Sequence, residues 1–211
     1  MLIVTAGMIG SGKTTLTTML ADHLHSEPFY EQVKDNPVLP EYYANPKKYA
    51  FSLQIYFLNK RFESIKKAFR NNNNVLDRSI YEDALFTKAN VDNGNISEVD
   101  YQIYLELLQN MLQEMSCMPK KAPDLMVFLN ADFDTILEHI KKRGRDYEQV
   151  DTHPDLLAYY KDIWTRYQSW YDSYNYSPKM YVDLSHQDLT NPKDKEIILG
   201  QIDDKLAEIR K

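Results

Sequence analysis

The segment from Gly7 to Thr15, which reads GMIGSGKTT, carries the clearest chemistry in the chain. It matches the phosphate-binding pattern GxxxxGKS/T at every fixed position. Glycines let backbone N–H groups turn inward around phosphate oxygens, a lysine reaches the outer phosphates, and the adjacent hydroxyl ligates Mg²⁺. We therefore expect ATP and Mg²⁺ here, with Thr14 as a metal ligand. The residues expected to hold ATP are Gly7, Met8, Ile9, Gly10, Ser11, Gly12, Lys13, Thr14 and Thr15.

The neighbouring segments supply the context that this motif requires. An apolar run at residues 2–4 predicts a strand before it, and residues 13–25 predict a helix after it. The positive end of that helix would face the same phosphates. A glycine-rich turn that binds nothing is the alternative, but three of the chain's 6 glycines lie in this one loop.

Two carboxylates and an arginine follow other predicted strands. Glu31 lies at the end of a strand predicted at residues 28–33, and Asp77 and Arg78 follow a short strand at residues 75–76. Ligands of parallel sheets bind at the carboxyl ends of strands. There Glu31 could accept a proton from a substrate hydroxyl, Asp77 could hold the metal ion, and Arg78 could neutralise phosphate charge. Equally, Glu31 could be an exposed edge residue, and Asp77 and Arg78 could serve other charge pairs.

A long helix predicted at residues 47–71 carries polar side chains in apolar surroundings. Gln54, Phe57 and Arg61 share one face of it. Buried Gln and Arg side chains need polar partners. The edge of a nucleobase would satisfy Gln54, and so would an internal hydrogen bond.

The basic run from Lys141 to Arg145 has two interpretations. Basic residues in a last helical turn followed by Gly144 form an ordinary helix end, and the residues alone slightly favour that reading. The other interpretation is a lid whose arginines close over nucleotide phosphates.

Strands and helices alternate along the chain, which predicts an α/β fold with a parallel sheet of about five strands and helices on both faces. Residues 1–211 are expected to form one domain, because no repeat or linker divides them. Pro40 and Pro46 predict an irregular stretch between the second strand and the long helix. The remaining strands are expected at residues 124–130 and 179–184, and the remaining helices at residues 80–90, 97–115, 133–143, 154–174 and 191–211.

Composition restricts the class of protein. The 211 residues are 43% hydrophobic with a net charge of −6, which suits a folded protein without a duplex nucleic-acid partner. Cys117 is the single cysteine, so an internal disulfide is excluded. No apolar run approaches membrane-spanning length, and the N-terminus does not read as a signal peptide. We expect a cytoplasmic protein.

Taken together, these segments resemble the deoxynucleoside kinases, most nearly the bacterial deoxyadenosine/deoxyguanosine kinases. The resemblance rests on segments that occur in family order over residues 1–150: GMIGSGKTT, YEQV followed by DNP, YYANPKKYAFSLQIYFLNKR, DRSIYED and KKRGRDYEQ.

The resemblance implies roles for individual residues. Glu31 is the base that deprotonates a 5′-hydroxyl, Asp77 organises the metal and is the alternative proton acceptor, and Arg78 bridges the base and the transferring phosphoryl group. It also favours a lid at about residues 141–153 over the simple helix end. It further implies that Gln54, Arg61 and Asp83, with Phe57 beside them, read and select the base. Tyr43 and Glu148 would contact the sugar 3′-hydroxyl. The lid residues Arg143 and Arg145 would contact phosphates.

Three positions depart from the family pattern. His139 stands where many members have another lid arginine, Gln32 replaces a proline of animal members, and Asp77 replaces their glutamate. A shorter acid at position 77 implies that the metal is reached through water.

The expected function is transfer of the ATP γ-phosphoryl group to the 5′-hydroxyl of a purine deoxynucleoside in nucleotide salvage. Deoxyadenosine is favoured, with deoxyguanosine or deoxycytidine as further candidates. The family implies a dimer, with an identical or related subunit, through the helices at residues 47–71 and 97–115. One rival is a thymidylate-type monophosphate kinase, which needs a second anion site for which Arg61 is the only obvious cation. Another is a non-catalytic nucleotide-binding subunit, which has no need to keep Lys13, Glu31, Asp77 and Arg78 together.

Overall fold

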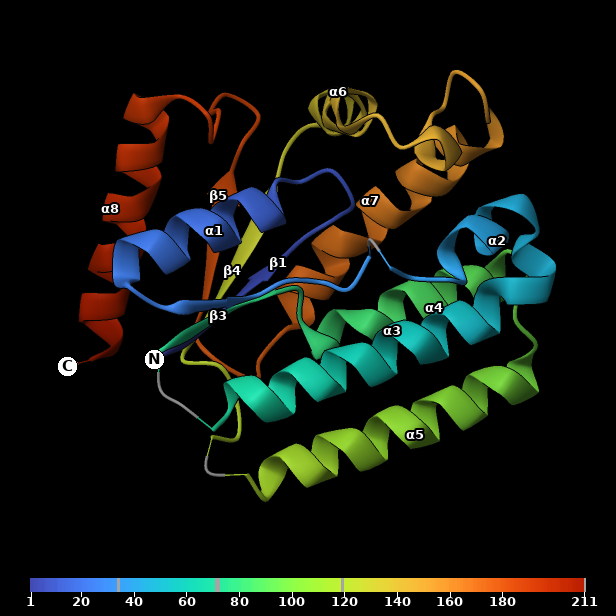
Figure 1. The fold of residues 1–211 in the computed structure, drawn as a ribbon, viewed down its shortest axis with the longest axis horizontal. Coiled ribbons are helices and arrows are strands. Elements are labelled where there is room, and N and C mark those ends of the chain that lie inside the picture. The colour runs from blue at the N-terminus through green and yellow to red at the C-terminus, as the bar shows by residue number, and fades with distance from the viewer. Residues whose placement is uncertain (34, 71–72, 119, 211) are drawn as a thin grey trace.

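The structure, a computed structural model, describes residues 1–33, 35–70, 73–118 and 120–210. Within those ranges, five parallel strands pair in the order β2-β3-β1-β4-β5 (Figure 1). They are β1 (Leu2–Ala6), β2 (Glu27–Phe29), β3 (Asn74–Asp77), β4 (Leu125–Asn130) and β5 (Lys179–Asp183). The sheet confirms the predicted parallel α/β fold.

Helices cover both faces of this sheet. The helices are α1 (Lys13–Leu24), α2 (Leu39–Ala44), α3 (Pro46–Ala68), α4 (Asp83–Asp92), α5 (Glu98–Ser116), α6 (Phe133–Arg143), α7 (Asp155–Ser173) and α8 (Pro192–Ile209), with short 3₁₀ turns η1 (Ile80–Glu82) and η2 (Asp146–Glu148). In Figure 1, α1 and α8 lie on one side of the sheet, and α3 and α5 lie on the other. None of the described helices is both long and apolar enough to cross a membrane.

The central strand β1 is buried on both faces, which explains its continuous apolar sequence. Its Ile3 packs with Leu16 of α1, whereas the alternate residue Val4 packs with Leu58 of α3. Val4 pairs with β3 on one side and with β4 on the other. The loop after β1 therefore opens where the strand order changes direction, which is where ligands of such sheets bind.

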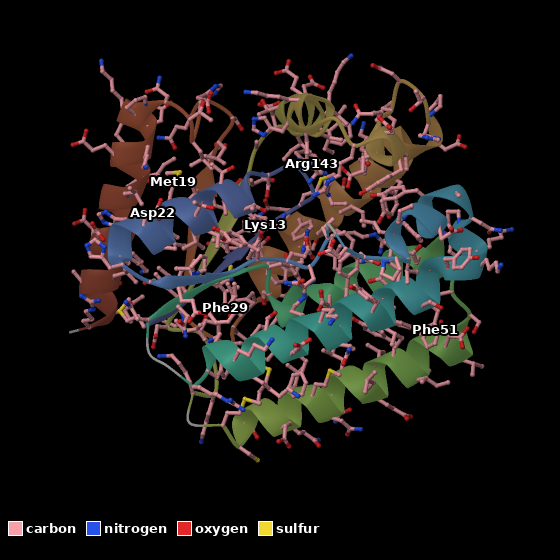
Figure 2. The ribbon with its side chains drawn as sticks, in the orientation of Figure 1. Lys13, Met19, Asp22, Phe29, Phe51 and Arg143 are labelled. Atoms are coloured by element: carbon pink, nitrogen blue, oxygen red, sulfur yellow. The ribbon has the colours of Figure 1, made fainter. Side chains whose placement is uncertain are left out.

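The first helix connects this core to the loop. Met19 of α1 is buried and Asp22 is exposed, so one side of the helix faces the core. Lys13 is the first residue of α1 and lies at its inner end, near the centre of the molecule (Figure 2). The fold thus directs the positive end of α1 toward the carboxyl ends of the strands.

The helix boundaries largely match the prediction. The helix predicted at residues 133–143 is α6, and it ends on Gly144 with φ of 70°, a left-handed conformation that glycine adopts without strain. Ser97 caps α5 by accepting a hydrogen bond from the Asp100 backbone N–H at 3.1 Å. The predicted helix ends at residues 71 and 211 lie outside the described residues.

Two predictions around the second strand are wrong. The strand predicted at residues 28–33 ends at Phe29, because β2 is an edge strand that pairs only with β3, and the last pair is Phe29 with Leu76. Glu31 therefore lies beyond the strand, in the connection that follows it.

The stretch containing Pro40 and Pro46 is also not irregular. Each proline lies in the first turn of a helix, α2 or α3, where its missing N–H has no intrahelical partner to lose. Asn45 then caps α3 through the Lys48 backbone N–H at 3.3 Å.

Candidate active site

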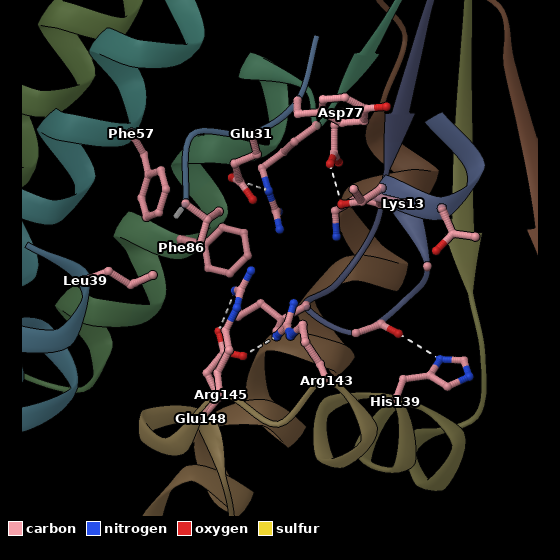
Figure 3. A pocket seen from close by; sticks show the side chains of 18 of the residues that line it. Lys13, Glu31, Leu39, Phe57, Asp77, Phe86, His139, Arg143, Arg145 and Glu148 are labelled. Carbon is pink, nitrogen blue, oxygen red and sulfur yellow. Dashed lines mark hydrogen bonds and ion pairs between the residues drawn. The ribbon is translucent and has the colours of Figure 1, made fainter. Parts of the chain in front are cut away.

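One cavity of about 540 Å³ opens at the carboxyl ends of the strands. All of the predicted site residues line it except Gly7, Met8 and Ser11, which are buried. Figure 3 shows Lys13 and Asp77 on one side of this pocket, with Arg143, Arg145 and Glu148 on the opposite side. The cavity therefore brings together residues from almost the whole length of the chain.

The loop after β1 has no room for side chains at two of its glycines. A Cβ on Gly7, whose φ is 142°, would lie 2.4 Å from the Leu129 carbonyl oxygen of β4. A Cβ on Gly10, whose φ is 84°, would lie 2.9 Å from the Ile136 carbonyl oxygen of α6. Both positions also have backbone conformations that other residues rarely adopt. The loop is thus held between β4 and α6.

Lys13 is buried and folded back onto its own loop. Its Nζ donates a hydrogen bond to the Met8 carbonyl oxygen at 2.6 Å. Burial, reinforced by the charge of Arg78, lowers the pKa of Lys13 to about 7. An ammonium group disfavoured in this way is stabilised by an anion placed beside it. Polyphosphate binding would supply that anion.

Thr14, at the start of α1, and Asp77, at the end of β3, bring a hydroxyl and a carboxylate together. The Thr14 hydroxyl donates to Asp77 Oδ2 at 2.5 Å. The other oxygen, Oδ1, is buried and has no hydrogen-bond partner among the described residues. Burial raises the pKa of Asp77, and Lys13 lowers it only in part. Oxygen ligands of this kind suit Mg²⁺, which usually takes one or two carboxylates together with water and substrate phosphates.

Glu31 lies between two arginines. Its Oε1 is 2.9 Å from Arg61 Nη2 and 2.8 Å from Arg78 Nε. Burial alone would raise its pKa, but the charges of Arg78, Arg61 and Lys13 together lower the pKa of Glu31 to about 2. The side chain is therefore a carboxylate that faces the cavity and is fixed in position (Figure 3).

Arg78 has an unusual backbone conformation for a long side chain. Its φ is 79°, directly after the end of β3, while its N–H still donates to the Thr5 carbonyl oxygen at 2.9 Å. Its Nη1 donates to the Tyr167 hydroxyl at 2.8 Å, and its guanidinium lies 4.9 Å from the centre of the Phe86 ring. Strain of this kind persists only where surrounding contacts impose it, and such positions cluster at functional sites.

At the end of the cavity away from the loop, α3 and α4 supply an ion pair and an amide. Arg61 Nε donates to both oxygens of Asp83, at 2.8 and 2.7 Å. Gln54 is also buried and lines the same cavity. Phe57 and Phe86 also line the cavity, and Figure 3 shows both rings near Glu31. A flat heterocycle could lie against these rings with its polar edge toward Gln54 and Arg61.

The segment after α6 folds back on itself. Glu148 accepts hydrogen bonds from Arg143 at 2.5 Å and from Arg145 at 3.1 Å. Tyr43 lies beside the following turn, with its ring 5.2 Å from that of Tyr147. Within α6 itself, His139 Nδ1 lies 2.9 Å from the Gly10 carbonyl oxygen. The basic run is thus both the end of α6 and one wall of the cavity.

Sequence reasoning missed parts of this site. The buried residues Glu82 and Tyr167 contact Arg78 without lining the cavity themselves. Ser79 and Glu82 form a capping box, and the spacing S-x-x-E immediately after Arg78 was a signal that could have found Glu82. No local pattern indicates Tyr167. Further missed residues include Phe86, beside Arg78, and a group that lines the cavity beside the phosphate loop: Leu184, Gln187, Asp188, Leu189 and Thr190.

Comparison with known proteins agrees with this geometry. The family model described as deoxynucleoside kinase matches residues 3–207. A deoxyguanosine kinase of Lactobacillus acidophilus is 53% identical over 99% of this chain and 92% of its own length. A deoxyadenosine kinase of the same organism is 45% identical over 98% and 97%. The solved structure of deoxyadenosine kinase from M. mycoides with bound dCTP superposes with a TM-score of 0.81, at 29% identity, and covers 97% of this chain and 100% of its own.

Proposed function

The chain belongs to the deoxynucleoside kinase family and is a nucleoside kinase, and on that premise we propose how its site works. The chain transfers the γ-phosphoryl group of ATP to the 5′-hydroxyl of a purine deoxynucleoside. The observation that carries the proposal is the position of Glu31. It lies in one cavity between Arg78, on the side of the phosphate loop, and Arg61, on the side of Gln54.

Each group of site residues has a separate role in the proposed reaction. The loop around Lys13 holds the triphosphate, and Glu31 accepts the proton of the 5′-hydroxyl as the oxygen attacks the γ-phosphorus. Arg78 neutralises the negative charge that spreads over the transferring group. Mg²⁺, held by Thr14 and Asp77 directly or through water, would neutralise phosphate oxygens. Because the pKa of Glu31 is about 2, it is a weak base, so proton transfer comes late, after the phosphoryl bond has begun to form.

Position, and not basicity, favours Glu31 over Asp77 as the proton acceptor, because the charges of Arg78 and Arg61 lower the pKa of Glu31 whereas burial raises that of Asp77. Glu31 faces the middle of the cavity, whereas one oxygen of Asp77 already accepts from the Thr14 hydroxyl at 2.5 Å. Asp77 is also the carboxylate nearest the expected metal site. We therefore assign the proton to Glu31 and the metal to Asp77.

The end of the cavity formed by Gln54, Arg61 and Asp83 favours deoxyguanosine as the preferred substrate, because its side chains suit a guanine base. Arg61 is a donor-only side chain, and guanine presents two acceptors, O6 and N7, on one edge, whereas adenine presents one acceptor and one donor. Asp83 could accept from the adenine amine, but Arg61 Nε already bonds both of its oxygens and leaves only their second lone pairs for such a contact. The names of the relatives agree, since a 53% identical relative is a deoxyguanosine kinase and a 45% identical one is a deoxyadenosine kinase. Deoxyadenosine, favoured by the sequence, stays the second candidate.

The sugar and the phosphates would share the wall formed by residues 141–153. Glu148 with Tyr43 would bind the 3′-hydroxyl, and Arg143 and Arg145 would contact the phosphates of ATP. In the structure both arginines instead pair with Glu148. Substrate binding would therefore exchange these ion pairs for contacts with ligand, and the segment would close over the site as a lid.

Two further expectations about the whole molecule remain proposals. We expect a cytoplasmic enzyme that salvages deoxynucleosides. We also expect a dimer, with an identical or related subunit, formed through α3 and α5. Val99 and Ile103 of α5 are exposed by 71% and 51%, which supplies apolar surface for such a contact.

A substrate panel tests the proposal. ATP with Mg²⁺ is supplied with each of the four deoxynucleosides, adenosine or thymidine monophosphate, and Lys13→Met is the inactive control. Deoxyguanosine should turn over fastest, with deoxyadenosine next. Turnover of thymidine monophosphate alone would contradict the proposal in favour of a monophosphate kinase. ATP binding with no turnover of any acceptor would favour a non-catalytic nucleotide-binding subunit.

A further inference from the structure

Glu82 is a fully buried carboxylate that joins three parts of the chain. Its Oε1 accepts a hydrogen bond from the Ser79 backbone N–H at 2.8 Å. Its Oε2 accepts from the Gly7 backbone N–H at 3.2 Å and from the Tyr167 hydroxyl at 2.8 Å. The phosphate loop, the turn after β3 and helix α7 therefore meet at one side chain that does not itself line the cavity.

The same cluster holds Arg78. Tyr167 accepts a hydrogen bond from Arg78 Nη1 at 2.8 Å, and that nitrogen lies 3.7 Å from Glu82 Oε2. On its other side, Arg78 Nε lies 2.8 Å from Glu31 Oε1. The guanidinium is thus fixed at both ends, which explains how the strained φ of 79° at this residue is maintained.

We propose that Glu82 and Tyr167 are positioning residues for phosphoryl transfer, which hold Arg78 in fixed register with the phosphate loop. This inference rests on the proposed function. Phosphoryl transfer depends on charges placed in advance where negative charge develops, so a displaced arginine lowers the rate even when both substrates still bind. Neither positioning residue touches substrate; each acts through Arg78 or Gly7.

A carboxylate is required at position 82 for a geometric reason. Its two oxygens face two backbone N–H groups, those of Ser79 and Gly7, and a backbone N–H cannot become an acceptor. The amide of a glutamine would direct its NH₂ group at one of these donors in either orientation. Glu82→Gln must therefore release either the turn after β3 or the phosphate loop.

Three variants test the inference in the full chain. Tyr167→Phe removes only the hydroxyl and keeps the ring beside Phe86 and Phe128. It should lower kcat by about tenfold, with KM for ATP and for the nucleoside changed by less than about twofold. Glu82→Gln should lower kcat further and also raise KM for ATP, because it loosens Gly7. Glu63→Gln is the control, because Glu63 is a half-exposed residue of α3 that pairs with Lys60 and Lys67, and it should change neither constant.

A double-mutant cycle separates positioning from loss of structure. In an Arg78→Met background, the side chain has no donor for the Tyr167 hydroxyl, so Tyr167→Phe should lower the residual kcat no further. Unchanged kcat for Tyr167→Phe alone, or the full loss repeated in the Arg78→Met background, would overturn the inference. Tyr167→Phe carries the test if Glu82→Gln does not fold. Absence of turnover by the unmodified chain would overturn the proposed function itself, and this inference with it.

Discussion

The Thr14 hydroxyl donates a hydrogen bond to Asp77 Oδ2 at 2.5 Å, and the second oxygen of that carboxylate is buried with no hydrogen-bond partner among the described residues. The two side chains come from the start of α1 and the end of β3, which lie next to each other because β1 and β3 pair in parallel. A buried carboxylate oxygen without a partner is costly unless something binds it. Hydrated Mg²⁺, as proposed for this site, would meet that requirement.

Asp77→Asn should weaken the response to Mg²⁺, because an amide keeps the shape of the side chain and loses its charge. We expect kcat to fall by about 10²–10³-fold and the Mg²⁺ concentration for half-maximal rate to rise by about tenfold. Rates measured against Mg²⁺ at saturating ATP check this. Thr14→Ser, which keeps the hydroxyl, is the matched control and should stay near the unmodified rate. An unchanged Mg²⁺ response for Asp77→Asn would show that the metal is held elsewhere.

ATP binding should take up a proton at Lys13. Burial and then Arg78 lower the pKa of Lys13 to about 7 in the free chain, and a bound triphosphate raises it again. Above about pH 7 the free side chain loses its proton while the bound one keeps it, so ATP affinity should weaken by up to about tenfold per pH unit. Below about pH 7 the Lys13 side chain is charged in both the free and the ATP-bound chain, so ATP binding no longer takes up a proton there.

Calorimetry at about pH 8 measures this uptake, with a non-hydrolysable ATP analogue in two buffers of different ionisation enthalpy. The apparent binding enthalpy should differ between the buffers in the direction of proton uptake by the complex. Lys13→Met should bind more weakly and lose the difference. Equal enthalpies in both buffers for the unmodified chain would contradict the prediction.

The ion pair between Arg61 and Asp83 should stabilise the fold only as a pair. Both side chains are 5% exposed, so removing one charge leaves the other buried. Asp83→Ala should cost about 3–5 kcal/mol in the free energy of unfolding, and the double variant with Arg61→Met should cost less than the sum of the single variants. Urea unfolding of all four proteins provides the cycle. Additive losses would mean that the pair is not coupled.

Much of this site was predictable because it rests on local patterns. The phosphate loop and the end of α6 each follow from a few neighbouring residues, and Gln54 and Arg61 share a helix face. The sequence also indicates Glu31 as a candidate site residue, but it predicts a strand that continues to residue 33, since nothing local shows that the edge strand β2 loses its partner after Phe29. Glu31 reaches the cavity because the chain leaves the sheet after Phe29, before the end of the predicted strand.

The S-x-x-E spacing indicates Glu82 as a capping residue, but the contacts by which Glu82 and Tyr167 position Arg78 could not be found from local patterns. Glu82 contacts Gly7 across 75 positions of sequence and Tyr167 across 85. Such contacts depend on the packing of α7 against the sheet, and the sequence carries no periodic signal for them. The strained backbone of Arg78 is hidden for the same reason, because the residue type does not indicate a positive φ.

The most direct test of the central claim is the turnover of Glu31→Gln with its nucleoside, compared with nucleoside binding by the same variant. The claim predicts that kcat falls by about 10²–10⁴-fold while the nucleoside Kd changes by less than about tenfold, since the variant keeps the cavity and loses the proton acceptor. Turnover within about threefold of the unmodified chain, with binding unchanged, would contradict it and leave Asp77 as the proton acceptor.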